Sequence, residues 1–149
     1  MLNALKNLFI ELSAGETAKP AATEQRQLKL AVAGLLHEMT RVDLKQSPEK
    51  AHTAVAAMAK MFGLPEPEAQ AMLKEAGSQR LTSYFDPASI IKRLLPLDQR
   101  IGLIENLWRV AFADSDLDVY EDQFVRKIAD LLYVPNTECM LARQRAKIP

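Results

Sequence analysis

Apolar residues recur with helical spacing along almost the whole chain from Glu24 onward. Residues three and four positions apart lie on one face of a helix, so each such run predicts a helix with one buried face. Seven such faces follow one another: Leu28, Leu30, Ala31, Leu35, Leu36 and Met39; Val55, Met58, Ala59 and Phe62; Ala69, Met72 and Leu73; Ile90, Ile91, Leu94 and Leu95; Ile101, Ile104, Leu107, Trp108 and Ala111; Phe124, Ile128, Leu131 and Leu132; Met140 and Leu141. No stretch alternates with a period of two for long enough to predict a strand. The pattern therefore predicts an all-α fold.

Capping residues mark where these helices begin and end. Ser47-Pro48 and Asp86-Pro87 each combine an N-cap oxygen with a proline in the first turn. Gly63 and Gly77 predict helix C-termini, because glycine adopts the left-handed conformation at little cost. Asn136 is the predicted cap of the last helix.

Residues 1–12 form a separate apolar pattern, which predicts a short amphipathic helix with a face of Leu2, Leu5, Leu8, Phe9 and Leu12. The small and polar residues 13–23 predict a linker to the main domain, residues 24–149. We expect Leu5, Leu8 and Phe9 to contact either this domain or a second copy of the chain, which would form a homodimer. The segment is far shorter than the ~20 apolar residues of a membrane span. Its polar face carries one lysine, which disfavours binding to a membrane surface.

Two parts of the main domain resemble each other. Residues 35–43 (LLHEMTRVD) predict a helix ending in Asp43, followed by a short loop and a helix with Glu49 in its first turn. Residues 107–114 (LWRVAFAD) end in Asp114, and Glu121 lies in the first turn of the next helix. Glu49 follows Asp43 by six residues, whereas Glu121 follows Asp114 by seven, so this pairing makes the first loop one residue shorter. The order of elements predicts a duplicated helical hairpin.

The most concentrated polar feature is a run of five carboxylates within nine residues: Asp114, Asp116, Asp118, Glu121 and Asp122. Hard divalent cations take oxygen ligands, and a loop in which Asp alternates with other residues supplies them. A standard EF-hand loop is excluded, because Val119 and Val125 stand where that loop requires Gly and a bidentate Glu. A divalent cation or a basic partner is one interpretation of this segment.

Helix capping is the other interpretation. Asp118 and Glu121 have the spacing of a capping box, and carboxylates in a first turn gain ~0.3–1 kcal/mol each from the helix dipole. Capping requires only one or two of the five carboxylates, so both interpretations stay open. If the two halves pack as a pair, their acidic loops would meet and share an ion. The candidate ligands are then Asp43, Glu49, Asp114 and Glu121, with Glu38, Asp116 and Asp118 as secondary candidates.

Composition narrows the function further. The chain has 149 residues, with 19 Lys and Arg against 19 Asp and Glu. A net charge of zero provides no general field for nucleic acid. The single cysteine, Cys139, excludes an internal disulfide and suits a reducing compartment, so we expect a cytoplasmic protein that does not bind nucleic acid.

The remaining chemical candidates are weaker. His37 and His52 lie neither three nor four residues from each other or from Cys139, so we interpret them as surface or interfacial residues. Cys139 has no companion thiol for zinc and is interpreted as a buried thiol. The helical spacing of four aromatic residues predicts core positions for Trp108, Phe112, Phe124 and Tyr133. The sequence carries no phosphate-binding loop and no hydrolase signature.

Several of these segments resemble the TerB-like family, which includes the helical proteins of tellurite-resistance operons and domains at the start of some DnaJ-like co-chaperones. The resemblance rests on residues 35–43, 61–64, 104–114 and 117–121. Its second-half pattern, Ala-Asp-Gly-x-Leu-x-x-x-Glu, is matched by Ala113, Asp114, Leu117 and Glu121, with Ser115 in place of Gly. It covers about residues 25–146. It implies a compact bundle of about seven helices built as two hairpins, with acidic loop residues that bind metal ions or partners in stress-linked complexes.

Carried over to this chain, the implied ligands are Asp114 and Glu121, together with Asp43 and Glu49. The family brings no enzymatic activity. We therefore expect a non-enzymatic binding or scaffold module whose acidic face holds a divalent cation or a basic protein partner. The alternatives are a carboxylate-based metal-dependent enzyme and a structural adaptor that dimerises through residues 1–12. No organic cofactor is expected.

Overall fold

The computed structural model describes residues 22–41, 47–79, 85–114 and 117–148. These ranges contain no strand and seven helices: a first helix over residues 22–39, α2 (Pro48–Phe62), α3 (Glu66–Ser78), α4 (Phe85–Leu94), α5 (Leu97–Phe112), α6 (Val119–Leu131) and α7 (Asn136–Ala146). The predicted all-α class is confirmed. The predicted N-terminal helix, with Leu5, Leu8 and Phe9, lies outside the described residues, as does most of the predicted linker.

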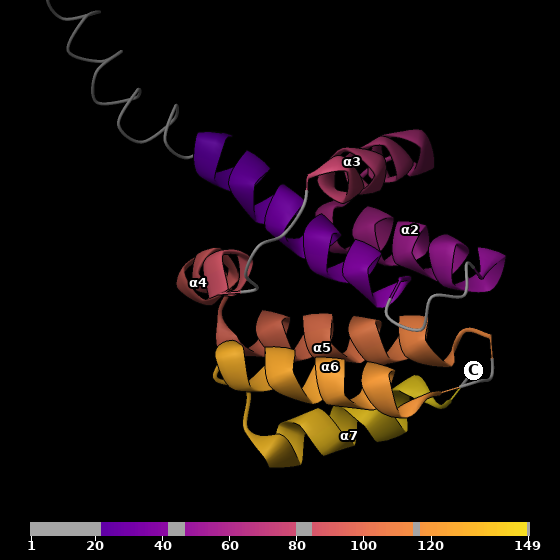
Figure 1. Ribbon diagram of the computed structural model, residues 1–149. Helices are drawn as coiled ribbons and strands as arrows, with labels where there is room; N and C mark the ends of the chain where they lie inside the picture. The colour runs from indigo at the N-terminus through magenta and orange to yellow at the C-terminus, as the bar shows by residue number, and fades with distance from the viewer. Residues whose placement is uncertain (1–21, 42–46, 80–84, 115–116, 149) are drawn as a thin grey trace, which may run out of the picture.

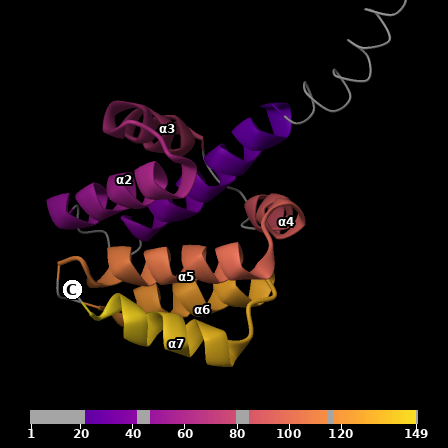
Figure 2. The same ribbon diagram turned by 180° about the vertical axis from the view of Figure 1, so that it is seen from behind.

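Helix α5 lies between two layers of helices. It packs against α2 on one side and against α6 and α7 on the other. The first helix, α2 and α3 make up one layer and α6 and α7 the other, as both views show (Figure 1 and Figure 2). Helix α4 lies at one end of the layers and contacts α6. Helices α2 and α6 both begin at the opposite end of the molecule, at the right of Figure 1. The loops that precede these two helices are therefore brought to one end.

A continuous apolar core joins the two layers. The first helix contributes Leu36 and Met39, and α5 contributes Ile104, Leu107 and Trp108, all fully buried. Burying one large apolar side chain stabilises a fold by about 1.5–3 kcal/mol. The apolar faces predicted for the first helix and α5 pack into this core, whereas Leu141, predicted on the apolar face of the last helix, is 48% exposed.

Tyr133 is exposed, so the prediction that placed it in the core is wrong. It is 70% exposed and adopts φ 55°, a left-handed conformation, just after α6 ends. The N–H of Val134 bonds to the carbonyl oxygen of Ala129 at 2.9 Å and closes the helix. Helical periodicity therefore stops before Tyr133, and its ring lies on the surface with Lys92 Nζ 4.0 Å from the ring centroid.

Two of the five predicted caps, Ser47 and Gly63, agree with the structure, whereas α4 already begins at Phe85, so Asp86 is a helical residue and not its N-cap. Ser47 caps α2, accepting a hydrogen bond from the N–H of Lys50 at 3.2 Å, and Gly63 ends it with φ 62°. Helix α3 continues past Gly77 to Ser78, so Gly77 is a helical residue instead of a C-cap. Asn136 is the first residue of α7 and makes no side-chain cap.

The two halves repeat in a defined register. The N-caps of α2 and α6, Ser47 and Asp118, lie 71 positions apart in the sequence. The same offset relates three pairs of fully buried residues on the first helix and α5: Val32 with Leu103, Leu36 with Leu107, and Met39 with Val110. The left-handed residues that end α2 and α6 are Gly63 and Tyr133, each followed two residues later by a proline. The duplicated hairpin predicted from the sequence is therefore visible in caps, core and helix ends.

Candidate functional site

The acidic segment begins helix α6 with a capping box. Asp118 is the N-cap, and its Oδ1 accepts hydrogen bonds from the backbone N–H groups of Tyr120 at 2.7 Å and Glu121 at 3.1 Å. Glu121 Oε1 in turn accepts from the N–H of Asp118 at 3.4 Å. The predicted structural role of Asp118 and Glu121 is confirmed. This box uses one oxygen of Glu121 and leaves the other for a second contact.

That second contact is a buried ion pair with Lys50. Lys50 Nζ donates to Glu121 Oε2 at 2.7 Å, and both side chains are 0% exposed. Asp114 Oδ2 lies 3.6 Å from the same ammonium, and its side chain is 18% exposed. An ammonium group has three donors, so it can serve both carboxylates. The three side chains join the N-terminus of α2 to the loop and first turn of the second half.

Lys50 is the positional equivalent of Glu121 in the internal repeat. Each is the third residue of its helix, three positions after the N-cap. Asp43 likewise precedes Ser47 by four residues, as Asp114 precedes Asp118. The pairing of Glu49 with Glu121 made from the sequence is therefore one residue out of register, and the first loop is not shorter than the second. A lysine in one half faces a glutamate at the matching position of the other.

The energetics of this pair depend on its burial. Removing a charge from water costs several kcal/mol, which only a close opposite charge with good hydrogen-bond geometry offsets. Lys50 carries a further electrostatic burden, because a cation at a helix N-terminus opposes the helix dipole. Glu121 and Asp114 supply the compensating negative charge. A lysine in the first turn of a helix, where acidic residues are favoured, is the sequence signal for this site.

The other candidate residues have different surroundings. Glu49 is exposed, and hydrogen bonds from its own backbone N–H and from the Ser47 hydroxyl, at 2.9 Å, lower its pKa. Asp122 pairs with Arg126 in its own helix and lies 3.7 Å from Arg143 Nε of α7. Glu38 lies 3.4 Å from Arg41.

A shared ion site would require the predicted acidic ligands of the two halves to converge. The structure brings Asp114 and Glu121 together, whereas Asp43 and Asp116 lie outside the described residues. In the described ranges, no three His, Cys, Asp or Glu side chains converge as a metal would need. The two carboxylates that do converge already contact an ammonium group. This donor set fits an internal lysine as the bound cation better than a resident divalent ion.

The histidines and the cysteine were the weaker candidates for chemistry. His52 is exposed on α2. His37 is partly buried on the first helix beside α3, and burial, together with the positive charge of Arg41, lowers its pKa. Cys139 is buried as expected, and burial raises the pKa of its thiol. Both effects favour the uncharged forms of these side chains.

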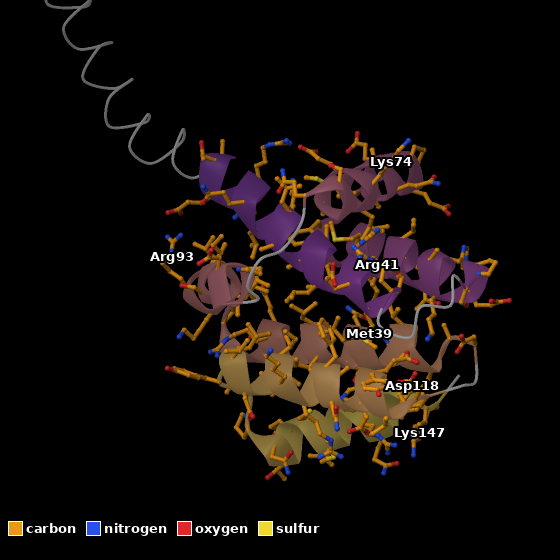
Figure 3. The ribbon with its side chains drawn as sticks, in the orientation of Figure 1. Met39, Arg41, Lys74, Arg93, Asp118 and Lys147 are labelled. Carbon is orange, nitrogen blue, oxygen red and sulfur yellow. The ribbon has the colours of Figure 1, made fainter. Side chains whose placement is uncertain are left out.

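The described surface carries some large apolar side chains. Val119 is 62% exposed and Tyr120 is 64% exposed, both in the first turn of α6. Asp118, in the same turn, lies at the end of the molecule where α2 and α6 begin (Figure 3). An exposed aliphatic and aromatic pair therefore adjoins the acidic loop.

None of the helices in the described part of the chain is both long and apolar enough to cross a membrane. No curated protein matches the chain at a significant level. The crystal structure of a protein of unknown function from Porphyromonas gingivalis W83 is similar in fold, with a TM-score of 0.62 and 20% sequence identity over 82% of this chain and 89% of that one. The family described as tellurite resistance protein TerB matches residues 29–144, which include both halves of the repeat. The chain therefore belongs to the TerB family.

Proposed function

We propose that this chain is a non-enzymatic protein-binding module, and that the end of the molecule where α2 and α6 begin recognises a basic segment of a partner. The observation that carries the proposal is the exposed pair Val119 and Tyr120 beside the carboxylates of Asp114 and Asp118. Tyrosine is enriched among the residues that dominate binding energy at interfaces. An acidic rim around an aromatic contact selects a partner with Lys or Arg next to an apolar side chain.

The carboxylates of this surface have different roles in the proposal. Glu121 is fully buried against Lys50 and holds the two halves together. Asp114 is partly exposed, and Glu49 at the start of α2 is exposed, so both can attract a cationic partner. Exposed charges of this kind act chiefly on association rate and on the choice of partner.

A carboxylate-based metal-dependent enzyme is supported less well. Such an enzyme needs a ligand set that leaves a position open for water or substrate, with a general base near it. Here the two converging carboxylates contact Lys50, and His37 lies on the first helix beside α3 instead. A divalent ion at Asp114 and Glu121 would have to displace the ammonium group.

The binding proposal is tested on an array of peptides that combine Lys or Arg with one apolar residue. Tyr120→Ser is expected to weaken binding of the positive peptides by about 30-fold, the loss typical of a central interface tyrosine. Leu141→Ser is the matched control, because Leu141 is 48% exposed but lies on α7. Raising the salt concentration should weaken binding further. Equal binding by Tyr120→Ser and the parent protein would contradict the proposal.

A second measurement addresses the divalent cation. Thermal unfolding of metal-stripped protein is followed while Ca²⁺, Mg²⁺, Mn²⁺ and Zn²⁺ are added in turn. An ion bound only by the folded state adds ~2.7 kcal/mol at a hundred times its dissociation constant. We expect no saturable stabilisation. A saturable rise in thermal stability that is lost in Asp114→Asn would contradict this expectation and indicate an ion site at Asp114.

The name of the matching family, tellurite resistance protein TerB, supports extending the proposal to the tellurite response. A strain lacking the protein should become sensitive to tellurite and be rescued by the parent gene and by Leu141→Ser. Failure of rescue by Tyr120→Ser, at equal protein level, would connect the binding surface to the phenotype. Equal rescue by the parent gene, Leu141→Ser and Tyr120→Ser would show that the tellurite phenotype does not depend on the binding surface.

Dimerisation through residues 1–12 is an independent proposal. If the chain is a dimer through this segment, removal of residues 1–23 should halve the solution mass.

A further inference from the structure

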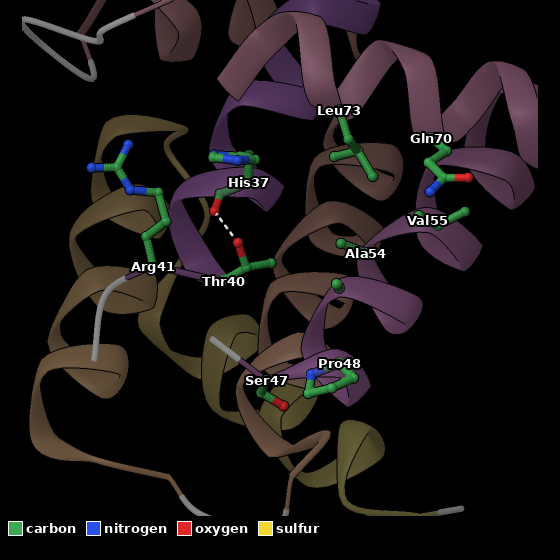
Figure 4. Close-up of a pocket in the computed structure, with 10 residues that line it drawn as sticks. His37, Thr40, Arg41, Ser47, Pro48, Ala54, Val55, Gln70 and Leu73 are labelled. Atoms are coloured by element: carbon green, nitrogen blue, oxygen red, sulfur yellow. Dashed lines mark hydrogen bonds between the residues drawn. The ribbon is translucent and has the colours of Figure 1, made fainter. Parts of the chain in front are cut away.

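A pocket of about 510 Å³ lies in the first half, on the side of α2 that faces α3 and the end of the first helix. Figure 4 shows His37 and Thr40 on one side of it, Leu73 above, and Gln70 and Val55 on the other side. Its volume is within the range of small-molecule sites, about 300–1,000 Å³. The apolar pair of the partner surface proposed above, Val119 and Tyr120, is on α6, which contributes no described residue to this lining, whereas the start of α2 borders both sites.

The internal repeat shows what fills the equivalent space in the second half. With the 71-residue offset, His37 corresponds to Trp108 and Arg41 to Phe112. Trp108 is fully buried and stacks on Phe112, with ring centroids 6.1 Å apart and an interplanar angle of 22°. Its indole N–H donates to the carbonyl oxygen of Cys139 in α7 at 3.2 Å. In the second half, therefore, an aromatic pair occupies the space between α5 and α7.

The helices that face this space, α3 and α2 in the first half and α7 and α6 in the second, also carry different side chains there. Arg143 of α7 lies over both Trp108 and Phe112, 5.5 Å and 5.6 Å from their ring centroids. The offset of 70 between the left-handed residues that end α2 and α6 pairs Arg143 with Leu73 in the first half. On α2, Ala51 and Val55 replace Asp122 and Arg126. The first half thus has smaller side chains where the second has a stacked, charged cluster, and the pocket is the space that results.

The chemistry of the lining restricts the ligand. Ala51, Ala54, Val55 and Leu73 supply apolar surface. Arg41 is the one charged residue in the described lining, which contains no carboxylate. Its side chain is 58% exposed, and its guanidinium lies 3.4 Å from Glu38 Oε1. Figure 4 shows this guanidinium beyond the His37 imidazole, on the side away from Leu73, so it can reach a ligand only at the edge of the pocket. There a guanidinium can bind a carboxylate with two parallel hydrogen bonds.

Two further polar groups shape the lining. Thr40 donates its hydroxyl hydrogen to the carbonyl oxygen of His37 at 2.6 Å, as the dashed line in Figure 4 marks. The imidazole of His37 lies against α3 so closely that a Cβ added at Gly77 would be 2.4 Å from His37 Nε2. The ring is therefore held at the side of the pocket by its contact with α3. The His37 ring therefore lines the pocket and does not fill it.

We propose that this pocket binds a small aromatic carboxylate, whose ring takes the place of the missing aromatic pair and whose carboxylate contacts Arg41. The ring contacts Leu73 and the small residues of α2. The carboxylate lies at the mouth, where Arg41 is the cation that the described lining supplies. Tyr120, the aromatic contact of the partner surface, lies on α6 and outside this lining, so its substitution tests the partner surface without changing the pocket.

The test uses benzoate, indole-3-acetate and 1-naphthoate as probes, titrated into ¹⁵N-labelled full-length protein and followed by backbone amide shifts. We expect saturable shifts at the lining residues of α2 and α3 with at least one carboxylate, and at least about tenfold weaker binding of its neutral amide. No saturable shift at these residues with any of the three, or equal affinity for a carboxylate and its amide, would overturn the proposal. Shifts confined to other helices would also overturn it.

Two variants test the assignment of the carboxylate. Arg41→Gln should weaken the carboxylate probe at least about tenfold while leaving the amide unchanged. Arg93→Gln is the matched control, because Arg93 lies on α4, outside the described lining, and its 54% exposed side chain also pairs with a glutamate, Glu24, at 3.0 Å. Ala51→Asp places a carboxylate in the lining and should also weaken the carboxylate probe. Both Arg41 and Ala51 are exposed, so the variants keep the fold, which circular dichroism verifies. Unchanged carboxylate affinity in Arg41→Gln would refute the role of Arg41, and unchanged affinity in Ala51→Asp would refute binding of the carboxylate in this pocket.

Discussion

The buried pair of Lys50 and Glu121 allows a quantitative prediction. Replacing Lys50 with Met leaves the Glu121 carboxylate in a site where its side chain is 0% exposed, and Glu121→Gln leaves the ammonium group in the same condition. Breaking one partner of a buried pair costs about 3–5 kcal/mol. Asp114, 3.6 Å from Lys50 Nζ, remains as a partial partner in Glu121→Gln, so this variant should lie at the lower end of that range. At roughly 3.5 °C per kcal/mol for a chain of this size, the melting temperature should fall by about 10–18 °C.

Urea unfolding of the parent, both single variants and the double variant measures the coupling as a double-mutant cycle. The double variant should lose much less free energy of unfolding than the two single losses combined, because it leaves no unpaired buried charge. The control cycle uses Arg93→Met and Glu24→Gln, a pair at 3.0 Å with 54% and 39% exposed side chains. Its coupling should be about 0–1 kcal/mol. Single losses under about 1 kcal/mol at Lys50 and Glu121, or losses that simply add, would refute a desolvated pair.

Three further predictions concern the first half. Gly77→Ala should lower the free energy of unfolding by about 1 kcal/mol, because the new Cβ meets the His37 ring at 2.4 Å. In a His37→Ala background the same substitution should raise the free energy of unfolding by a similar amount, because alanine favours the helix more than glycine does. A change of the same sign in both backgrounds would refute the contact between Gly77 and His37. Gly63→Ala should cost about 1–2 kcal/mol, because φ is 62° while nothing lies within 4 Å of the added Cβ, and a loss near zero in urea unfolding would refute the left-handed cap. Burial lowers the pKa of His37 in the folded state, so the unfolded chain binds this proton first as the pH falls below about 6.5. The free energy of unfolding should therefore decrease as the pH falls from about 6.5 toward the folded-state pKa. His37→Gln should reduce this dependence of stability on pH, whereas His52→Gln, at an exposed position, should not.

The sequence predicted the fold well because its signals are local. A serine followed by proline at Ser47-Pro48, a glycine at Gly63 and an unbroken apolar face each determine part of a helix without reference to the rest of the chain. The misplacement of Tyr133 has a local cause too. Periodicity extends the apolar face to Tyr133, the residue at which the backbone turns left-handed, and glycine, the usual signal of such a turn, is absent there.

The candidate site was predicted only in part, because its main interaction joins residues 71 positions apart. The capping box of Asp118 and Glu121 was found from spacing alone, since both residues belong to one turn. The partner of Glu121 was missed because the repeat was aligned on the matching residue type, Glu49, when the N-caps set the register at Lys50. A search for opposite charges at equivalent positions would have found the pair.

The unlike charges at the matching positions of α2 and α6 also restrict how such a chain can evolve. Two copies of the first half would bring two ammonium groups together, and two copies of the second half would bring two carboxylates together. Each half can therefore assemble only with the other, which penalises exchange of halves between chains. A change at either position alone leaves a buried charge without its neutralising partner. Lys50 and Glu121 are thus expected to vary together among the descendants of this chain, and their reversal to Glu and Lys is the substitution that preserves the pair.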